Sequence, residues 1–106
     1  MFATVRRYEG VDASRTDELS KKVNENLMPR LSKLPGFGGY YLISAGNGVM
    51  TSVSLFETVA QADESTSLVV GWVQDEELEK ALPNAPKITT GEVIVHHSAN
   101  RAMAAV

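Results

Sequence analysis

The sequence predicts an α+β fold in which two helices cover one face of a four-stranded antiparallel sheet. Three observations lead to this prediction. A Gly-Asn-Gly turn at 46–48 separates two runs rich in aromatic and β-branched residues, which is typical of a β-hairpin. Apolar residues recur at helical spacing on either side of that hairpin. A further extended run near each end of the chain completes the order β-α-β-β-α-β.

The central segment, residues 34–58, reads LPGFGGYYLISAGNGVMTSVSLFET. Its Pro-Gly pair ends the preceding helix, because proline cannot continue a helix and glycine tolerates left-handed dihedral angles. We expect the two strands of the hairpin at Phe37 to Ala45 and at Val49 to Glu57. The turn between them needs residues with positive φ, which Gly46, Asn47 and Gly48 supply.

The first strand is expected at Phe2 to Glu9, followed by an amphipathic helix. The helix has an apolar stripe at spacings of four and three, made of Leu19, Val23, Leu27, Leu31 and Leu34. Pro29 lies inside the stripe and lacks the N–H that a helix interior needs, so we expect a kink or a break there. The second piece is expected to stop at Pro35.

The second half of the chain predicts another helix and a closing strand. Thr58 is expected to cap the helix, which continues through Trp72. The stretch from Pro83 to Thr90 contains two prolines and is predicted as a loop. The last strand is expected at Glu92 to His97, whose centre is a Val-Ile-Val run. The domain is therefore expected to span residues 1–97, and the Ala-rich tail at 98–106 stays unassigned.

Alternate residues of the predicted strands indicate a sheet with two apolar faces. In the second strand Tyr40 and Leu42 lie on one side, while Tyr41 and Ile43 lie on the other. Two helices cover only one face, and an uncovered apolar face of this size would promote aggregation. We therefore predict a homodimer in which the sheets of two copies face each other.

Composition limits the class of protein. A chain of 106 residues with 43% hydrophobic and 22% charged residues is expected to form one globular domain. The net charge of −3 argues against a nucleic-acid partner, and the absence of cysteine excludes disulfides and thiolate chemistry. No apolar run reaches the roughly 20 residues of a membrane span, so we expect no membrane partner and a cytoplasmic protein.

The quoted motifs resemble the antibiotic biosynthesis monooxygenase (ABM) domain over roughly residues 1 to 97. The resemblance is carried by LPGFGGYYLI, by GNGVMTSVSLFET, by an acidic helix with Trp72, and by the closing GEVIVHH. It implies a ferredoxin-like subunit that pairs into a dimeric α/β barrel. It also implies a cofactor-independent monooxygenase or isomerase that acts on a small aromatic or cyclic substrate.

Aromatic residues are the candidates for binding a substrate. The resemblance places Trp72, the single tryptophan, where it would wall a pocket between helix and sheet, although its apolar neighbours also fit a core position. One of Tyr40 or Tyr41 would orient the ring, and Tyr8 is a further donor for an oxygenated ring. As strand aromatics, all three tyrosines are expected first as packing residues with a polar tip at the rim.

Two basic residues are the candidates for catalysis. One of Arg6 or His96 would favour the anion of the substrate. Neighbouring strand residues point to opposite faces, so we expect Arg6 and Arg7 to diverge, and His96 and His97 cannot chelate one metal ion. The chain shows no phosphate-binding, flavin or nicotinamide motif, so we expect no metal and no cofactor. The resemblance extends to haem-degrading enzymes that use a histidine on the second helix, and because this chain has none there we expect no haem.

Two hypotheses of function remain open at this point. The first is an ABM-type enzyme with its pocket between the helices and the sheet. The second is a non-catalytic dimeric module that binds a small hydrophobic ligand or a protein partner. A pocket filled by apolar side chains such as Met50 and Phe56 would favour the second hypothesis, because no substrate would fit.

Overall fold

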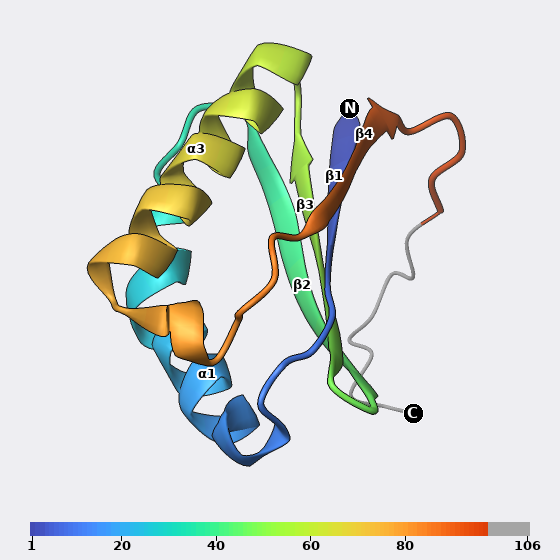
Figure 1. The fold of residues 1–106 in the computed structure, drawn as a ribbon. Coiled ribbons are helices and arrows are strands. Elements are labelled where there is room, and N and C mark those ends of the chain that lie inside the picture. The colour runs from blue at the N-terminus through green and yellow to red at the C-terminus, as the bar shows by residue number, and fades with distance from the viewer. Residues whose placement is uncertain (98–106) are drawn as a thin grey trace, which may run out of the picture.

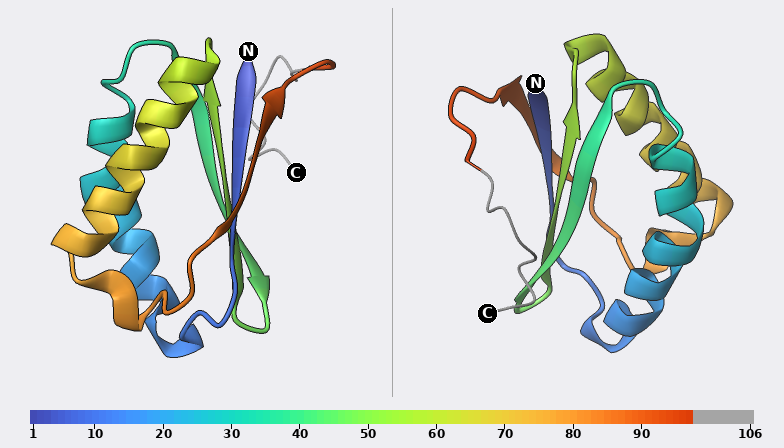
Figure 2. Two further views of the ribbon diagram at one scale, coloured as in Figure 1. Left: turned by 45° about the horizontal axis from the view of Figure 1, so that its top comes forward. Right: turned by 180° about the vertical axis from the view of Figure 1, so that it is seen from behind.

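A computed structural model describes residues 1–97, so the tail that begins at Ser98 lies outside the described residues. Its elements follow the predicted order, and the sheet order β2-β3-β1-β4, antiparallel throughout, is that of a ferredoxin-like α+β fold. The helices lie on one face of the sheet (Figures 1 and 2). The strands are β1 (Phe2–Tyr8), β2 (Phe37–Gly46), β3 (Val49–Phe56) and β4 (Lys87–Glu92). The helical segments are η1 (Ala13–Arg15), α1 (Thr16–Lys22), η2 (Val23–Leu27), α2 (Met28–Leu31), α3 (Val59–Asp75) and η3 (Leu78–Lys80).

The hairpin of β2 and β3 forms as the glycines predicted. Gly46, Asn47 and Gly48 have φ angles of 82°, 53° and 74°, which place all three in the left-handed region. The turn connects strands whose register runs from Phe37 opposite Phe56 to Gly46 opposite Val49. The prediction of this hairpin is confirmed to within one residue at each strand end.

The first helical region is interrupted near Pro29, as expected. It consists of α1, a π-helical turn η2 and the short α2, with Pro29 in the first turn of α2. Proline has no N–H to donate to the preceding turn, and the wider π turn accommodates this missing bond. The region ends at Leu31, before Pro35. Its predicted apolar stripe is buried, with Leu27 and Leu31 at most 1% exposed.

Helix α3 begins with a complete capping box. The Thr58 hydroxyl accepts a hydrogen bond from the Gln61 backbone N–H at 3.2 Å, and the Gln61 side chain accepts one from the Thr58 backbone N–H at 3.1 Å. The buried face of α3 then follows helical spacing and consists of Ala62, Ser65, Val69 and Trp72. Two of these four residues, Ala62 and Ser65, are small, which lets the helix lie close to the sheet.

The position of the last strand was predicted wrongly. β4 spans Lys87–Glu92, so part of the predicted loop is strand, and residues 93–97 have no regular secondary structure. The position of β4 is determined by its hydrogen-bonded pairing with β1, in which Ile88 lies opposite Arg6 and Glu92 lies opposite Phe2. Beyond Phe2 the partner strand ends, and one bond from the Val93 N–H to the Met1 carbonyl, 2.9 Å, closes the ladder. The Val-Ile-Val run has high β propensity but no strand beside it.

One face of the sheet is buried under the helices and the other is exposed, and the alternation of residues alone did not show which face is which. Tyr8, Met50 and Phe56 point to the helices and are buried. The opposite face carries Tyr41, which is 61% exposed, and Ile43, which is 47% exposed. No helix of residues 1–97 covers this outer face (Figure 2). The homodimer through this face stays a prediction.

None of the helices within residues 1–97 combines the length and the apolar character that crossing a membrane requires. The cytoplasmic location and the domain boundary at residue 97 stay predictions.

The capping box provides a test of the local folding signal. We expect Thr58→Ala to lower the free energy of unfolding by about 1 kcal/mol, because an N-cap hydroxyl satisfies a backbone N–H that otherwise has no partner. Thr58→Ser keeps the hydroxyl and serves as the control. Urea denaturation measures both variants, and an equal loss in Thr58→Ser would show that the cap is not the cause.

Candidate functional site

The site centres on Arg6, a charged side chain buried between the sheet and α3. It lies in the middle of β1 on the helix-facing side and is 1% exposed. Its Nη1 donates to the Ser54 hydroxyl at 3.0 Å. Its Nη2 donates to the Ser65 hydroxyl at 3.1 Å and to the Thr66 hydroxyl at 2.7 Å. These partners come from β3 and α3, so the guanidinium joins three elements of the fold.

All of these partners are neutral, so the charge of Arg6 has no counter-ion within residues 1–97. The four ion pairs of the described chain use other basic residues: Arg7, Arg15, Lys22 and Lys87. Burial lowers the pKa of Arg6, and Tyr8 and Tyr40 act in the opposite direction. The Nε of Arg6 is buried and makes no hydrogen bond. Burying a cation without a counter-ion costs free energy, and hydrogen bonds to neutral hydroxyls do not remove its charge.

A cavity of about 340 Å³ opens beside Arg6, at the β4 edge of the fold. Its volume lies within the range of small-molecule sites. The segment that leads from η3 back to β4 forms one wall. Arg6, Tyr8 and Thr66 supply polar groups, whereas the exposed Glu79 contributes a carboxylate. The apolar part of the lining consists of Val69, Val70, Val73, Leu82, Pro83, Ala85, Pro86 and Ile88.

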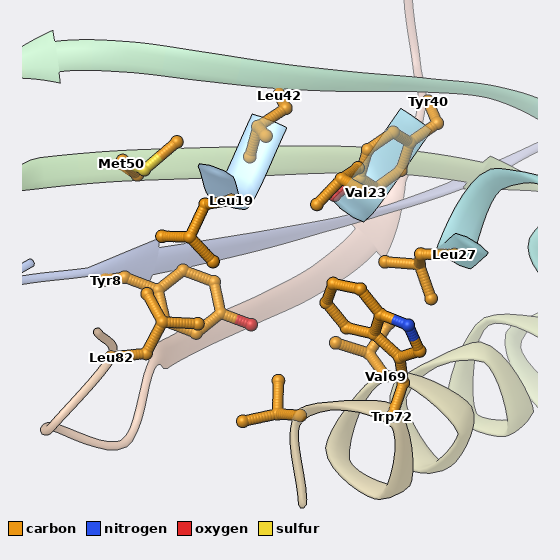
Figure 3. A pocket seen from close by; sticks show the side chains of 11 residues that line it. Tyr8, Leu19, Val23, Leu27, Tyr40, Leu42, Met50, Val69, Trp72 and Leu82 are labelled. Carbon is orange, nitrogen blue, oxygen red and sulfur yellow. The ribbon is translucent and has the colours of Figure 1, made fainter. Parts of the chain in front are cut away.

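A second, much smaller cavity lies deeper between the helices and the sheet (Figure 3). Its volume of about 30 Å³ is too small for a ring compound. Trp72, Tyr40 and Met50 line it together with apolar residues of the first helical region. Trp72 is 2% exposed, and its indole N–H is buried without an acceptor. Tyr8, Val69, Val73 and Leu82 line both cavities, so the two share a wall.

The tyrosines of the interior are hydrogen-bond donors at neutral pH. Burial raises the pKa of Tyr8, and the charge of Arg6 only partly opposes the rise. Burial also raises the pKa of Tyr40, against a smaller effect of the Ser52 hydroxyl. Both phenols therefore keep their proton near pH 7, and neither is a base.

The structure brings some of the predicted site residues together and separates others. Arg6 lines the wide cavity, while Trp72 and Tyr40 line the narrow one behind it. Tyr41 lies on the outer face of the sheet. His96 is exposed in the segment that follows β4, and it is not among the residues that line the cavities described here.

The sequence reasoning missed the hydroxyl groups around Arg6. Ser54 is buried at 0% exposure in a strand with alternating burial, and Ser65 occupies a core position of α3. A polar residue at an apolar position of a helix or strand pattern was the available signal. The divergence of Arg6 and Arg7 is confirmed, because the Arg7 side chain is 55% exposed and pairs with Glu9. Within the described residues, no group of three or more His, Cys, Asp or Glu side chains is placed to hold a metal ion.

Comparison with solved structures identifies the fold. NE2512, a protein of unknown function from Nitrosomonas europaea, matches with a TM-score of 0.74 and 14% identity over 94% of this chain and 95% of that one. The monooxygenase from the gene ActVA-Orf6 of Streptomyces coelicolor, in complex with nanaomycin D, matches at 0.67 and 15% over 92% of both chains. Solved antibiotic biosynthesis monooxygenases are also among the matches. The chain has an ABM-like fold.

A further match is a mutant of MhuD with two manganese protoporphyrin IX molecules bound per active site. It has a TM-score of 0.72 and 16% identity, over 93% of this chain and all of that one. No family model matches the sequence, and no curated protein matches it. At these sequence identities the similarity establishes the ABM-like fold only. The chemistry has to be argued from the residues of the site.

The unpaired charge leads to a test of stability. We expect Arg6→Met to raise the free energy of unfolding by about 1–4 kcal/mol, because an apolar side chain of similar length removes a buried charge. Arg7→Met is the control, and its effect should stay within about 0.5 kcal/mol because Arg7 is exposed. Urea denaturation at neutral pH measures both, and a strong loss of stability in Arg6→Met would show that the hydroxyl contacts outweigh the buried charge.

Proposed function

We propose that this chain is an ABM-type enzyme that binds the anion of a small aromatic or cyclic substrate in the wide cavity beside Arg6. The observation that carries the proposal is the buried guanidinium with neutral partners next to a cavity of about 340 Å³. The apolar lining suits a ring, and the guanidinium suits its ionised oxygen. Trp72 and Tyr40 belong to this site as the layer behind the cavity, whereas roles for Tyr41 and His96 stay predictions.

The proposed chemistry is cofactor-independent oxygenation or isomerisation. Arg6 stabilises the enolate or phenolate form of the substrate and lowers its pKa. Such an electron-rich anion reacts with O₂ itself. When a ring CH₂ becomes C=O, one oxygen atom of O₂ enters the product and the other leaves as water, so atoms and electrons balance. In an isomerisation, the same anion regains its proton at a different carbon.

The alternative function is a non-catalytic module that binds a small hydrophobic ligand or a protein partner. Two observations favour it. The narrow cavity beside Trp72 is nearly filled by side chains, Met50 among them. The ionisable acceptor among the residues of the wide cavity is Glu79, which is exposed, so the interior contains no evident base.

Oxygen uptake with 1,4-dihydroxynaphthalene distinguishes the two functions. We expect uptake above the uncatalysed rate, and a loss of roughly 10²–10³-fold in kcat/KM for Arg6→Met, as for removal of an oxyanion donor. Arg7→Met should keep full activity. Binding of the compound that depends on Arg6 without uptake would favour the module, and absence of binding would overturn the anion site.

We also propose that the outer face of the sheet is where a second copy binds. Val5, Val53 and Leu55 lie on this face beside the exposed Tyr41 and Ile43. A face of this kind is typically covered by a partner, and the self-complementary solution is a two-fold dimer.

Light scattering tests the dimer. We expect the mass of two chains for the unmodified protein at micromolar concentration and the mass of one for Ile43→Lys, because a charge would be buried in the interface. Val59→Lys changes an equally apolar side chain, 49% exposed at the start of α3, and should remain a dimer. A monomeric mass for the unmodified protein would contradict the proposal.

A further inference from the structure

Tyr8 is placed to contact the same ligand as Arg6. It follows Arg6 by two residues on β1, so both side chains point to the helix-facing side of the sheet. Both line the wide cavity, and Tyr8 also lines the narrow one. Figure 3 shows its hydroxyl pointing away from β1 and toward Trp72, into the space between the sheet and α3.

The Tyr8 hydroxyl lacks a protein partner. The residue is 8% exposed, and within residues 1–97 no side chain or backbone group forms a hydrogen bond with its oxygen. A buried tyrosine hydroxyl usually has a partner, because leaving it unpaired costs free energy. The Tyr8 oxygen is not among the fully buried unpaired atoms, so it keeps access to the cavity, whereas the unpaired Nε of the neighbouring Arg6 is buried. An accessible hydroxyl without a protein partner, two residues from a buried guanidinium, fits a ligand that carries a hydrogen-bond acceptor.

The charged and titratable groups around this region define the ligand further. Arg6 and Tyr8 come from β1, and Tyr40 comes from β2. α3 contributes Thr66 and Gln74 to the wide cavity, neither of which titrates, and β4 contributes Ile88. The exposed Glu79 supplies the carboxylate of this lining. One buried positive charge opposed by a negative charge at the exposed end suits an anion with a single charge better than a dianion.

We propose that Tyr8 donates a hydrogen bond to the ionised oxygen that Arg6 neutralises, and that the ligand is a ring compound with one singly charged oxyanion, either a carboxylate or an acidic ring hydroxyl. This proposal rests on the anion site proposed above and adds a second ligand-contacting residue to it. The protein supplies donors and charge but no buried base at this point, so the ligand binds as an anion that already exists in solution, or it loses its proton to water as it binds. Tyr8 thereby sets which oxyanions are accepted.

Titration of bound 4-nitrophenol tests the role of Tyr8, because its phenolate absorbs visible light and reports its own pKa. We expect the pKa of the bound probe to lie 1–2 units below that of the free probe, as beside a buried Arg. Tyr8→Phe should raise the pKa of the bound probe by about 1 unit and weaken binding about tenfold near neutral pH. Tyr41→Phe is the matched control and should change neither quantity, because Tyr41 lies exposed on the outer face of the sheet and does not line the wide cavity.

Each outcome has a distinct meaning. No binding of the probe to the unmodified protein would overturn the anion site itself. Binding that is lost in Arg6→Met but unchanged in pKa and affinity in Tyr8→Phe would overturn only the role of Tyr8. A purely structural role would lower the melting temperature of Tyr8→Phe without moving the pKa of the bound probe.

The same assay separates the ligand types. Competition with 4-nitrobenzoate tests the carboxylate, and 4-nitrophenyl phosphate tests a dianion on the same ring. We expect the phosphate to compete at least tenfold more weakly than the better monoanion, because it carries a second negative charge. Stronger competition by the phosphate would overturn the assignment to monoanions.

Discussion

The rest of the structure is organised around a buried guanidinium that has hydroxyl partners but no counter-ion. Arg6 reaches from the central strand β1 to Ser54 on β3 and to two residues of α3. Each contact is a hydrogen bond to a neutral group, so the contacts orient the side chain without removing the cost of its charge. A side chain held in this way has little conformational freedom left to lose, which suits the anion site proposed above.

The topology explains why the opening lies at the β4 edge. β1 is an inner strand of the sheet, and α3 packs against it and against its neighbours β3 and β4. β4 is short, and the chain that precedes it crosses from η3 to the edge of the sheet (Figure 1). Two prolines of this crossing, Pro83 and Pro86, line the wide cavity. On the other side of Tyr8, the stripe of the first helical region packs against Trp72 and leaves about 30 Å³. The fold is thus well packed in the layer behind the site and open in front of it.

Several polar groups of the interior are hydrogen-bond donors. Arg6, Tyr8 and Trp72 present N–H or O–H groups, and the phenols keep their protons because burial raises their pKa. A region that contains donors and one cation stabilises negative charge as it develops on a ligand. The same region is poorly suited to removing a proton. Reactivity toward O₂ would therefore have to come from the bound anion.

Local signals in the sequence predicted most of the fold. The left-handed residues at 46–48 determined the hairpin, and Thr58 with Gln61 determined where α3 begins. Pro29 determined where the first helical region is interrupted. Arg6 was identified from the sequence as a candidate because a strand places it opposite to Arg7. These features depend on residues close together in the sequence, so local conformational preferences are enough to predict them.

The tertiary structure decided what depends on partners distant in sequence. β4 lies where β1 offers a ladder, which moved the strand from the Val-Ile-Val run to Lys87–Glu92 and left His96 outside the sheet. Both faces of the sheet are apolar in sequence, so only the packing of the helices determined that Arg6, and not Arg7, is buried. The hydroxyl partners of Arg6 lie 48 to 60 residues away along the chain, and no local pattern connects residues so far apart. By itself the sequence determined the order and type of most elements, whereas the site exists only through contacts between them.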